Sequence, residues 1–309
     1  CFRDGNPEDY LSIQIPIDFY DYKSIDHPDV VVVDEFFQKV FPDREVRHYF
    51  LDQVCQVFAG GNRNKVILFW IGEGNNGKTV TQTLFEKMLG PLAIKFSTTL
   101  VTGKKVQFGN DSFWARDLFQ KGKEAREIVP LFKLHMICNK LPAIKDADQA
   151  TWNRIRVIPF ESTFVHEQDC PEDIEEQLQQ KKFPMDKRFY EKIPKMIQPL
   201  AWYLLQRYKT VCRLEQIEPE KVKVATHVYM QENDLFCQFE QQCVHQDDGK
   251  KMYFSVFYNL FKDWFRQEAP GSLIPNRNTV KKHYIKQWGE LELNLYWTNK
   301  SCALNTTKY

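Results

Sequence analysis

The segment Gly72–Thr79, with the sequence Gly-Glu-Gly-Asn-Asn-Gly-Lys-Thr, has the residue types and spacing of a phosphate-binding loop. Glycines let the backbone wrap closely around a polyphosphate, and the loop N–H groups and the following helix N-terminus provide positive potential. Lys78 can reach the terminal phosphates, and the Thr79 hydroxyl can take a magnesium position. A plain glycine-rich turn would leave the Gly-Lys-Thr ending unexplained. The candidate nucleotide-binding residues are Gly72, Glu73, Gly74, Asn75, Asn76, Gly77, Lys78 and Thr79.

The residues on both sides of this segment predict the elements that position it. Val66–Ile71 is a continuous apolar run, which is typical of a strand buried on both faces. Val80–Leu89 carries apolar residues at helical spacing and stops at Gly90-Pro91. A buried strand, a glycine-rich loop and a helix together predict a site for ATP and Mg²⁺.

Two later strands are expected to add polar groups to this site. Leu131–Asn139 is mostly apolar, and Asn139 at its carboxyl end would face the crevice where such sheets bind ligands. There it could orient an attacking water near the γ-phosphate, although an Asn three residues before Pro142 also suits a turn. Trp152–Phe160 alternates arginine with apolar residues, which places Arg154 and Arg156 on one face. Either arginine could reach a neighbouring subunit's γ-phosphate, or form a surface ion pair instead.

Two basic segments are candidates for nucleic-acid contacts. An aromatic stretch at Ser112–Phe119, a turn and a second strand at Ala125–Val129 predict a β-hairpin with Lys121 and Lys123 at its tip. An ordinary solvated turn is the alternative. Near the C-terminus, predicted helices at Val256–Phe265 and Thr279–Trp288 and an alternating stretch at Leu291–Trp297 suggest a winged-helix module, although many small α+β domains share this order. Its second helix would present Lys281, Lys282, His283 and Lys286.

The remaining chain is predicted to be largely helical. Helices are expected from His27-Pro28 to Phe41 and from Glu45 to Gly60, within residues 171–209, and over Pro219–Val244. Val30–Glu35 imitates an apolar strand ending in a magnesium-binding acidic pair, but its apolar spacing continues helically. We divide the chain into residues 1–62 (helical), 63–165 (P-loop core), 166–248 (helical) and 249–309 (winged-helix-like).

Composition sets limits on the class of protein. The 309 residues are 43% hydrophobic and 27% charged, with a net charge of +1, which excludes a grossly basic nucleic-acid binder but leaves room for a local basic groove. The eight cysteines include no CxxC pair, which favours reduced thiols in a cytosol-like compartment and argues against a zinc site. No apolar run is long enough for a membrane span. Because the chain starts at Cys1, we expect it to be part of a longer protein.

In the order of these motifs the chain resembles the superfamily-three helicases, specifically the primase-helicases of the large cytoplasmic DNA viruses of the poxvirus and asfarvirus type. The resemblance covers about residues 1–245, and the matching pieces are Gly72–Thr79, Gly109–Arg116, Phe132–Pro142 and Arg154–Phe160, preceded by the helix that starts near His27.

The resemblance implies an α/β fold with an AAA+-like P-loop ATPase core, working as a homo-hexamer in the host cytoplasm with a primase domain earlier in the chain. ATP would lie at each subunit interface and DNA in the channel. Lys78 and Thr79 would hold nucleotide and Mg²⁺, Asn139 would be the sensor, Arg154 or Arg156 the finger acting in trans, and Lys121 and Lys123 the DNA contacts.

One part that the resemblance requires is missing. The family carries an apolar strand ending in acidic residues between the phosphate-loop helix and the hairpin, and residues 90–111 contain no such strand. We interpret this as a stretch absent from the sequence near Val106–Gly109. The alternatives are a nucleotide-gated DNA-binding or assembly protein without motor activity, and a P-loop kinase, which would share Gly72–Thr79.

Overall fold

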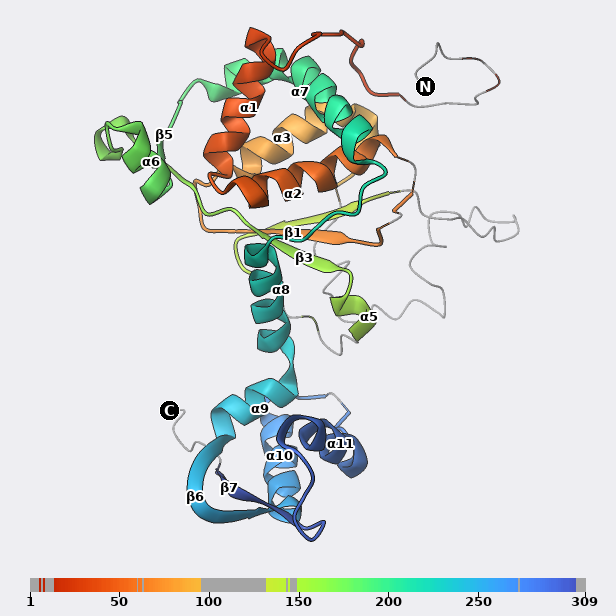
Figure 1. The fold of residues 1–309 in the computed structure, drawn as a ribbon, viewed down its shortest axis with the longest axis vertical. Coiled ribbons are helices and arrows are strands. Elements are labelled where there is room, and N and C mark those ends of the chain that lie inside the picture. The colour runs from red at the N-terminus through yellow and green to blue at the C-terminus, as the bar shows by residue number, and fades with distance from the viewer. Residues whose placement is uncertain are drawn as a thin grey trace. The chain divides into compact units, whose positions relative to one another are not determined.

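The apolar run before the phosphate-loop segment forms the central strand of a parallel sheet (Figure 1). The computed structural model describes residues 14–59, 61–62, 64–95, 132–142, 149–271 and 273–303, together with Asn6, Glu8 and Ile144. Within these, the chain divides into two compact units, Cys1–His227 and Val228–Tyr309.

The sheet of the first unit has the strand order β2-β1-β3, with all three strands parallel. The strands are β1 (Ile67–Ile71), β2 (Leu134–Cys138) and β3 (Ile155–Pro159). In register, Ile71 pairs with Cys138 on one side and with Pro159 on the other. The residues that follow these three strands therefore meet at one edge of the sheet.

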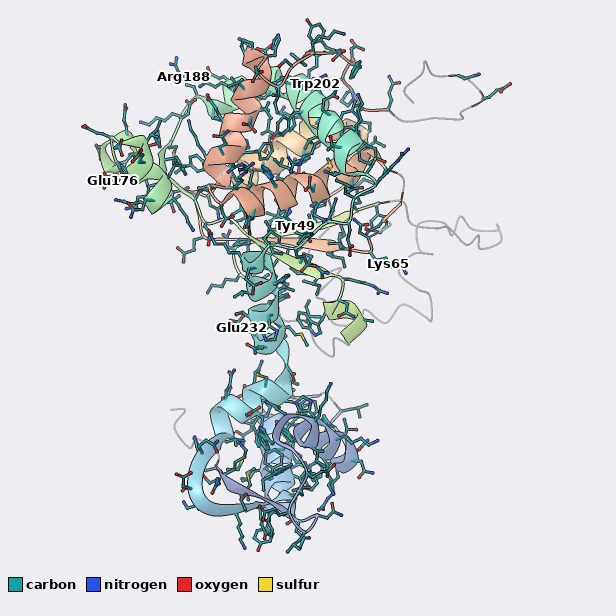
Figure 2. The ribbon with its side chains drawn as sticks, in the orientation of Figure 1. Tyr49, Lys65, Glu176, Arg188, Trp202 and Glu232 are labelled. Atoms are coloured by element: carbon teal, nitrogen blue, oxygen red, sulfur yellow. The ribbon has the colours of Figure 1, made fainter. Side chains whose placement is uncertain are left out.

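Four helices cover one face of this sheet: α1 (Pro28–Val40), α2 (Arg44–Val54), α3 (Lys78–Leu89) and α7 (Phe189–Val211) (Figure 1). Leu68 and Trp70, two residues apart on β1, join the same buried core as residues from these helices. Tyr49, labelled in Figure 2, contributes to this core from α2 and is 4% exposed. Alternate residues of a strand point to the same face, so this face of β1 is the one that the helices bury.

Local sequence explains where α1 and α2 begin. The His27 side chain accepts a hydrogen bond from the Asp29 N–H, and Pro28 occupies the first turn of α1, where its missing N–H has no cost. Asp43 caps α2 by accepting hydrogen bonds from the N–H groups of Glu45 and Val46. Val30–Glu35 therefore lies in a helix, as its spacing predicts.

Shorter elements complete the first unit. They are η2 (Cys55–Phe58), η3 (Gly90–Leu92), α5 (Gln149–Trp152), β4 (Thr163–Val165), η5 (Glu167–Asp169), α6 (Ile174–Gln180) and β5 (Lys182–Pro184). β4 and β5 pair in parallel, so residues 171–209 contain a strand that the helical prediction missed.

The second unit has the order α9 (Leu235–Cys243), β6 (Val244–Tyr253), α10 (Phe254–Glu268), α11 (Arg277–Trp288) and β7 (Tyr296–Cys302), with β6 and β7 antiparallel. An aromatic core that includes Phe257, Phe261, Trp264 and Tyr284 holds it together. The predicted helices at 256–265 and 279–288 are confirmed. The strand starts at Tyr296, later than the alternating pattern suggested, because residues 293–295 form a turn with Leu293 and Asn294 at positive φ.

The single helix predicted over Pro219–Val244 is wrong. α8 (Glu220–Asn233) ends before Asp234, whose carboxylate accepts hydrogen bonds from the N–H groups of Phe236 and Cys237 and so starts α9. Val244 then opens β6, which no sequence pattern indicated. The predicted hairpin, with Lys121 and Lys123 at its tip, lies outside the described residues. No helix in the described part of the chain is long and apolar enough to cross a membrane.

Candidate functional site

The loop Gly72–Thr79 joins the end of β1 to the start of α3, and two of its glycines have no room for a side chain. A Cβ on Gly72 would lie 2.3 Å from Asn76 Nδ2 and 2.5 Å from the Phe160 carbonyl oxygen. Gly77 has φ +85°, and a Cβ there would lie 2.9 Å from Val40 Cγ2. Gly74 meets nothing within 4 Å. The pattern's two fixed glycines are thus the two that the packing requires, while Gly74 is sterically free.

Lys78 lies at the centre of this loop. Its Nζ donates to the carbonyl oxygens of Gly72, at 2.5 Å, and Glu73, at 3.0 Å, and to Asn76 Oδ1 at 3.2 Å. The residue is 5% exposed, and burial lowers the pKa of its ammonium. A phosphate group in the loop would supply the negative charge that three neutral oxygens do not.

The loop is held by strands as well as by Lys78. The Phe160 N–H donates to the Ile71 carbonyl and the Phe164 N–H to the Asn75 carbonyl, both at 2.7 Å. Asn76 is 4% exposed; its side chain accepts a hydrogen bond from the Lys78 N–H and donates to the Phe160 carbonyl. The chain after β3 therefore fixes the loop conformation, which is the preorganisation that anion binding by backbone N–H groups needs.

The start of α3 leaves hydrogen-bond donors available. Gly77 occupies the N-cap position and has no side chain to cap the helix. Within the described residues, the N–H groups of Thr79 and Val80 have no hydrogen-bond acceptor. Thr79 is exposed, so its hydroxyl is open to a ligand or to a hydrated metal ion. These groups fit the phosphates of a nucleotide at a helix N-terminus.

A cavity of about 480 Å³ opens beside Asn75–Val80, within the usual size range of small-molecule sites. Its other walls are α1, the β4–β5 pair and the start of α7. Glu35 and Lys39 of α1 line it, together with Lys187 and Tyr190. Sequence reasoning assigned Val30–Glu35 to a helix but did not place Glu35 beside the phosphate loop. The helical spacing of Val32, Phe36 and Lys39 was the signal that these residues share a face.

Asn139 follows β2 in the same way that Gly72 follows β1. Because Ile71 pairs with Cys138, both residues lie at the carboxyl edge of the sheet, and the Asn139 side chain is exposed there. The thiol of Cys138 is close enough for Lys78 to act on its pKa, although burial has the larger effect and raises it. The expectation that Asn139 and Lys78 share one crevice is consistent with this register.

Arg154 and Arg156 lie toward the opposite end of the sheet. The Ile67 N–H donates to the Arg154 carbonyl, which places Arg154 beside the first residue of β1. At 3.3 Å per residue, that position is about 13 Å along the strand from Ile71, where the phosphate loop begins. Arg154 is exposed and forms no ion pair with the described residues. Neither arginine is therefore placed to act on the phosphate loop of its own chain.

Arg156 already has partners within its own chain. Its Nε forms an ion pair with Glu218, and its Nη1 donates to the carbonyls of Asn153 and Ile155. The pair packs against the phenol of Tyr49, whose pKa is raised mainly by burial and further by the Glu218 charge. Of the two arginines considered as a finger, Arg154 is the one without an ion-pair partner among the described residues.

In the second unit, Lys281 and Lys282 lie on α11 as predicted. Lys281 Nζ donates to Asn294 Oδ1 at 2.5 Å, whereas Lys282 and Lys286 are exposed and form no ion pair with the described residues. His283 instead stacks on Phe236 with 4.3 Å between ring centroids, and burial lowers its pKa. Of the four basic residues predicted on this helix, Lys282 and Lys286 are therefore the open ones.

The described residues include no cluster of three or more His, Cys, Asp or Glu side chains that could hold a metal ion. The Thr79 hydroxyl would supply one oxygen ligand, and Mg²⁺ at phosphate-binding sites is otherwise held by phosphates, waters and one or two carboxylates. No carboxylate corresponding to the expected acidic strand lies in the described part of the chain. All seven cysteines described are free thiols.

No protein-family model matches the chain. It is 36% identical to the protein named "Putative helicase 022R" of Frog virus 3 (isolate Goorha), a match that covers 91% of this chain and 39% of that protein. It is also 36% identical to "Putative helicase 121R" of Invertebrate iridescent virus 3, over 97% of this chain and 36% of that protein. The chain thus spans less than two-fifths of the length of these relatives.

These matches include positions that this chain lacks. The match to the Frog virus 3 protein extends over 382 positions and that to the Invertebrate iridescent virus 3 protein over 347, whereas this chain has 309 residues. Among solved structures, the apo NrS-1 C-terminal region (305–718) is similar with a TM-score of 0.44 and 14% identity, covering 82% of this chain and 61% of that one. A likeness at that level supports no conclusion about function.

Proposed function

We propose that this chain is the ATP-dependent motor segment of a viral DNA helicase, with ATP and Mg²⁺ bound at Gly72–Thr79. The observation that carries the proposal is the loop itself, in which steric need for Gly72 and Gly77, a buried Lys78 ammonium and open N–H groups of α3 coincide. The names of the relatives from Frog virus 3 and Invertebrate iridescent virus 3 support the choice of helicase among the many activities that use such a loop.

In this proposal each group has a defined task. The loop N–H groups and Lys78 bind and orient the phosphates, and Thr79 offers its hydroxyl to Mg²⁺, which would screen the phosphate charge. Asn139, at the same sheet edge, orients the attacking water. Arg154 extends from the far edge toward the triphosphate of the neighbouring subunit in a homo-hexameric AAA+-like ring.

DNA contacts belong to two places in the proposal. Lys121 and Lys123 would follow the phosphates within the ring channel. The second unit would act as a winged-helix module, with Lys282 and Lys286 of α11 toward DNA and Lys281 holding the turn that contains Asn294. The order α9–β6–α10–α11–β7 supports this because α11 is followed by a turn and a returning strand.

The test uses the natural full-length protein, with forked DNA, ATP and Mg²⁺. We expect DNA-stimulated ATP hydrolysis and strand separation, both abolished by Lys78→Ala. Hydrolysis without separation of any fork, with a 5′ or a 3′ tail, would contradict the helicase assignment.

A second candidate is a nucleotide-gated DNA-binding or assembly protein without motor activity. Its motivation is that the sequence between the phosphate-loop helix and the predicted hairpin contains no apolar strand ending in acidic residues. The names of the relatives favour the first candidate. ATP binding without any turnover by the natural full-length protein would establish the second.

A further inference from the structure

The cavity beside the phosphate loop extends along α1, away from the loop. The C-terminal end of α1 touches the loop, because a Cβ on Gly77 would meet Val40 at 2.9 Å. Lys39, Phe36, Glu35 and Val32 all line the cavity and lie progressively farther along the helix. At a rise of 1.5 Å per residue, Glu35 is about 7.5 Å and Val32 about 12 Å along the axis from Val40. This is the length over which the sugar and base of a nucleotide follow its phosphates.

One wall of this path is aromatic. Phe36 of α1 and Phe189 of α7 pack with ring centroids 5.3 Å apart, and Phe36 is 7% exposed. Tyr190, which follows Phe189 in the chain, lines the cavity and is 58% exposed. It makes no ring contact with the described residues. An exposed aromatic face beside a buried aromatic pair can stack on a base.

Along α1 the charge of the side chains that line the cavity changes sign from Lys39 to Glu35. The opposite wall carries Lys187 and the ion pair of Lys192 with Asp186. Lys78 and Lys39 lie at the loop end, where phosphate charge would be. Glu35 comes one helical turn later, is exposed, and forms no ion pair with the described residues, Lys39 included. A carboxylate so close to a triphosphate would repel it, but at the level of the sugar it can accept hydrogen bonds from hydroxyl groups.

We propose that this cavity holds the nucleoside half of a ribonucleoside triphosphate, with Tyr190 stacked on the base and Glu35 bonded to the sugar hydroxyls. The inference rests on the proposed nucleotide site at Gly72–Thr79. It adds two residues that determine which nucleotides bind, on elements far from the loop in sequence.

The experiment measures the affinities of the chain for ATP, 2′-deoxy-ATP and inorganic tripolyphosphate by calorimetry. Tyr190→Ala should weaken ATP binding about tenfold, since one stacked base is worth about 1–3 kcal/mol and 1.4 kcal/mol is a factor of ten, and leave tripolyphosphate unchanged. Tyr190→Phe should restore ATP binding. Glu35→Ala should bring the ratio of the affinities for ATP and 2′-deoxy-ATP to near one.

Controls separate this inference from the proposed function. Tyr253→Ala, at an exposed tyrosine of the second unit, should change none of the affinities. Lys78→Ala should weaken ATP and tripolyphosphate alike. If Lys78→Ala has that effect but Tyr190→Ala and Glu35→Ala change nothing, the nucleoside assignment is wrong and the phosphate site stands. If the unsubstituted chain binds neither ATP nor tripolyphosphate, both are wrong.

Discussion

At the scale of single residues, the loop Gly72–Thr79 distinguishes glycines that the packing needs from one that it does not. Gly72 and Gly74 are two residues apart, yet only Gly72 faces backbone and side-chain atoms closer than 3 Å to an added Cβ. The sequence pattern treats Gly74 as a variable position, and the structure gives the physical reason: open space surrounds it.

We therefore predict opposite outcomes for two alanine substitutions. Gly72→Ala should lower the free energy of unfolding by about 1–3 kcal/mol, because the Phe160 carbonyl must shift, and should also weaken ATP binding. Gly74→Ala should leave both unchanged. Urea unfolding and ATP titration of the two variants check this, and equal effects would contradict the described loop geometry.

His135 on β2 is a second residue with a defined physical signature. Burial lowers its pKa to about 4, and its Nδ1 is buried without a hydrogen-bond partner among the described residues. Because the folded-state pKa lies below the ordinary value of about 6.5, the unfolded chain binds the proton more readily. The stability due to neutral His135 is thus complete above pH 6.5 and falls as the pH drops toward 4.

When the pH is lowered from 7.5 to 5, protonation of His135 in the unfolded chain should reduce the free energy of unfolding by about 2 kcal/mol, at 1.4 kcal/mol per pKa unit. Urea unfolding at the two pH values, compared with His135→Gln, isolates its share, since the variant should lose less stability on acidification. An identical loss in both proteins would show that His135 is not buried in neutral form.

At the scale of elements, α8 and the segment that leads into it contact β3. The Val157 N–H donates to Thr226 Oγ1 at 3.0 Å, and Arg156 pairs with Glu218. Both side chains of the pair are about one-fifth exposed. An uncovered strand edge is prone to wrong pairing, so these contacts have a structural purpose independent of any catalysis.

Arg156→Ala and Glu218→Ala should each destabilise the chain by about 1–3 kcal/mol, and the double variant should cost less than their sum. Arg154→Ala, two residues away and exposed, should leave stability unchanged. Denaturant unfolding of the four proteins measures this coupling. Strictly additive costs would mean that the Arg156–Glu218 pair is absent in solution.

Many of the helices and strands could be predicted from the sequence, because hydrophobic periodicity and the residues that start or end helices act locally. β1, α1, α3, α10 and α11 were predicted this way, and the helical spacing after Val33 correctly outweighed the resemblance of Val30–Glu35 to a strand. β5 and β6 were missed, since three residues carry no period and β6 is mostly polar. The break at Asp234 depends on a side-chain cap that a continuous helical period conceals.

The candidate site was predictable in part for the same reason. Gly72–Thr79 is a contiguous pattern, so its residues could be named directly. Glu35 and Tyr190 could not be, because tertiary packing brings α1 and α7 to the loop from positions more than 30 residues before and 100 residues after it. That Arg156 is already paired also depends on a residue 62 positions away.

At the scale of the whole molecule, the proposal requires subunits to complete one another's sites. Arg154 lies at the end of the sheet opposite its own phosphate loop, so in this proposal it would assist hydrolysis at a neighbouring subunit. Arg154→Ala should keep ATP affinity and lose turnover by about 10³-fold or more.

A mixing experiment with the natural full-length protein tests this arrangement. Arg154→Ala supplies intact phosphate loops, Lys78→Ala supplies intact arginines, and mixed rings should recover part of the hydrolysis that each variant lacks. Arg156→Ala serves as the matched comparison. Poor ATP binding by Arg154→Ala, with no recovery on mixing, would remove Arg154 from the site.

The nucleotide site itself is tested most directly by calorimetric titration of ATP into the chain and into Lys78→Ala. We predict one ATP bound per chain, and a loss of about 10- to 100-fold in affinity in the variant, because a charge-assisted hydrogen bond is worth about 1.5–3 kcal/mol. An equal affinity in both proteins, or no binding to either, would contradict the assignment of Gly72–Thr79 as the nucleotide site.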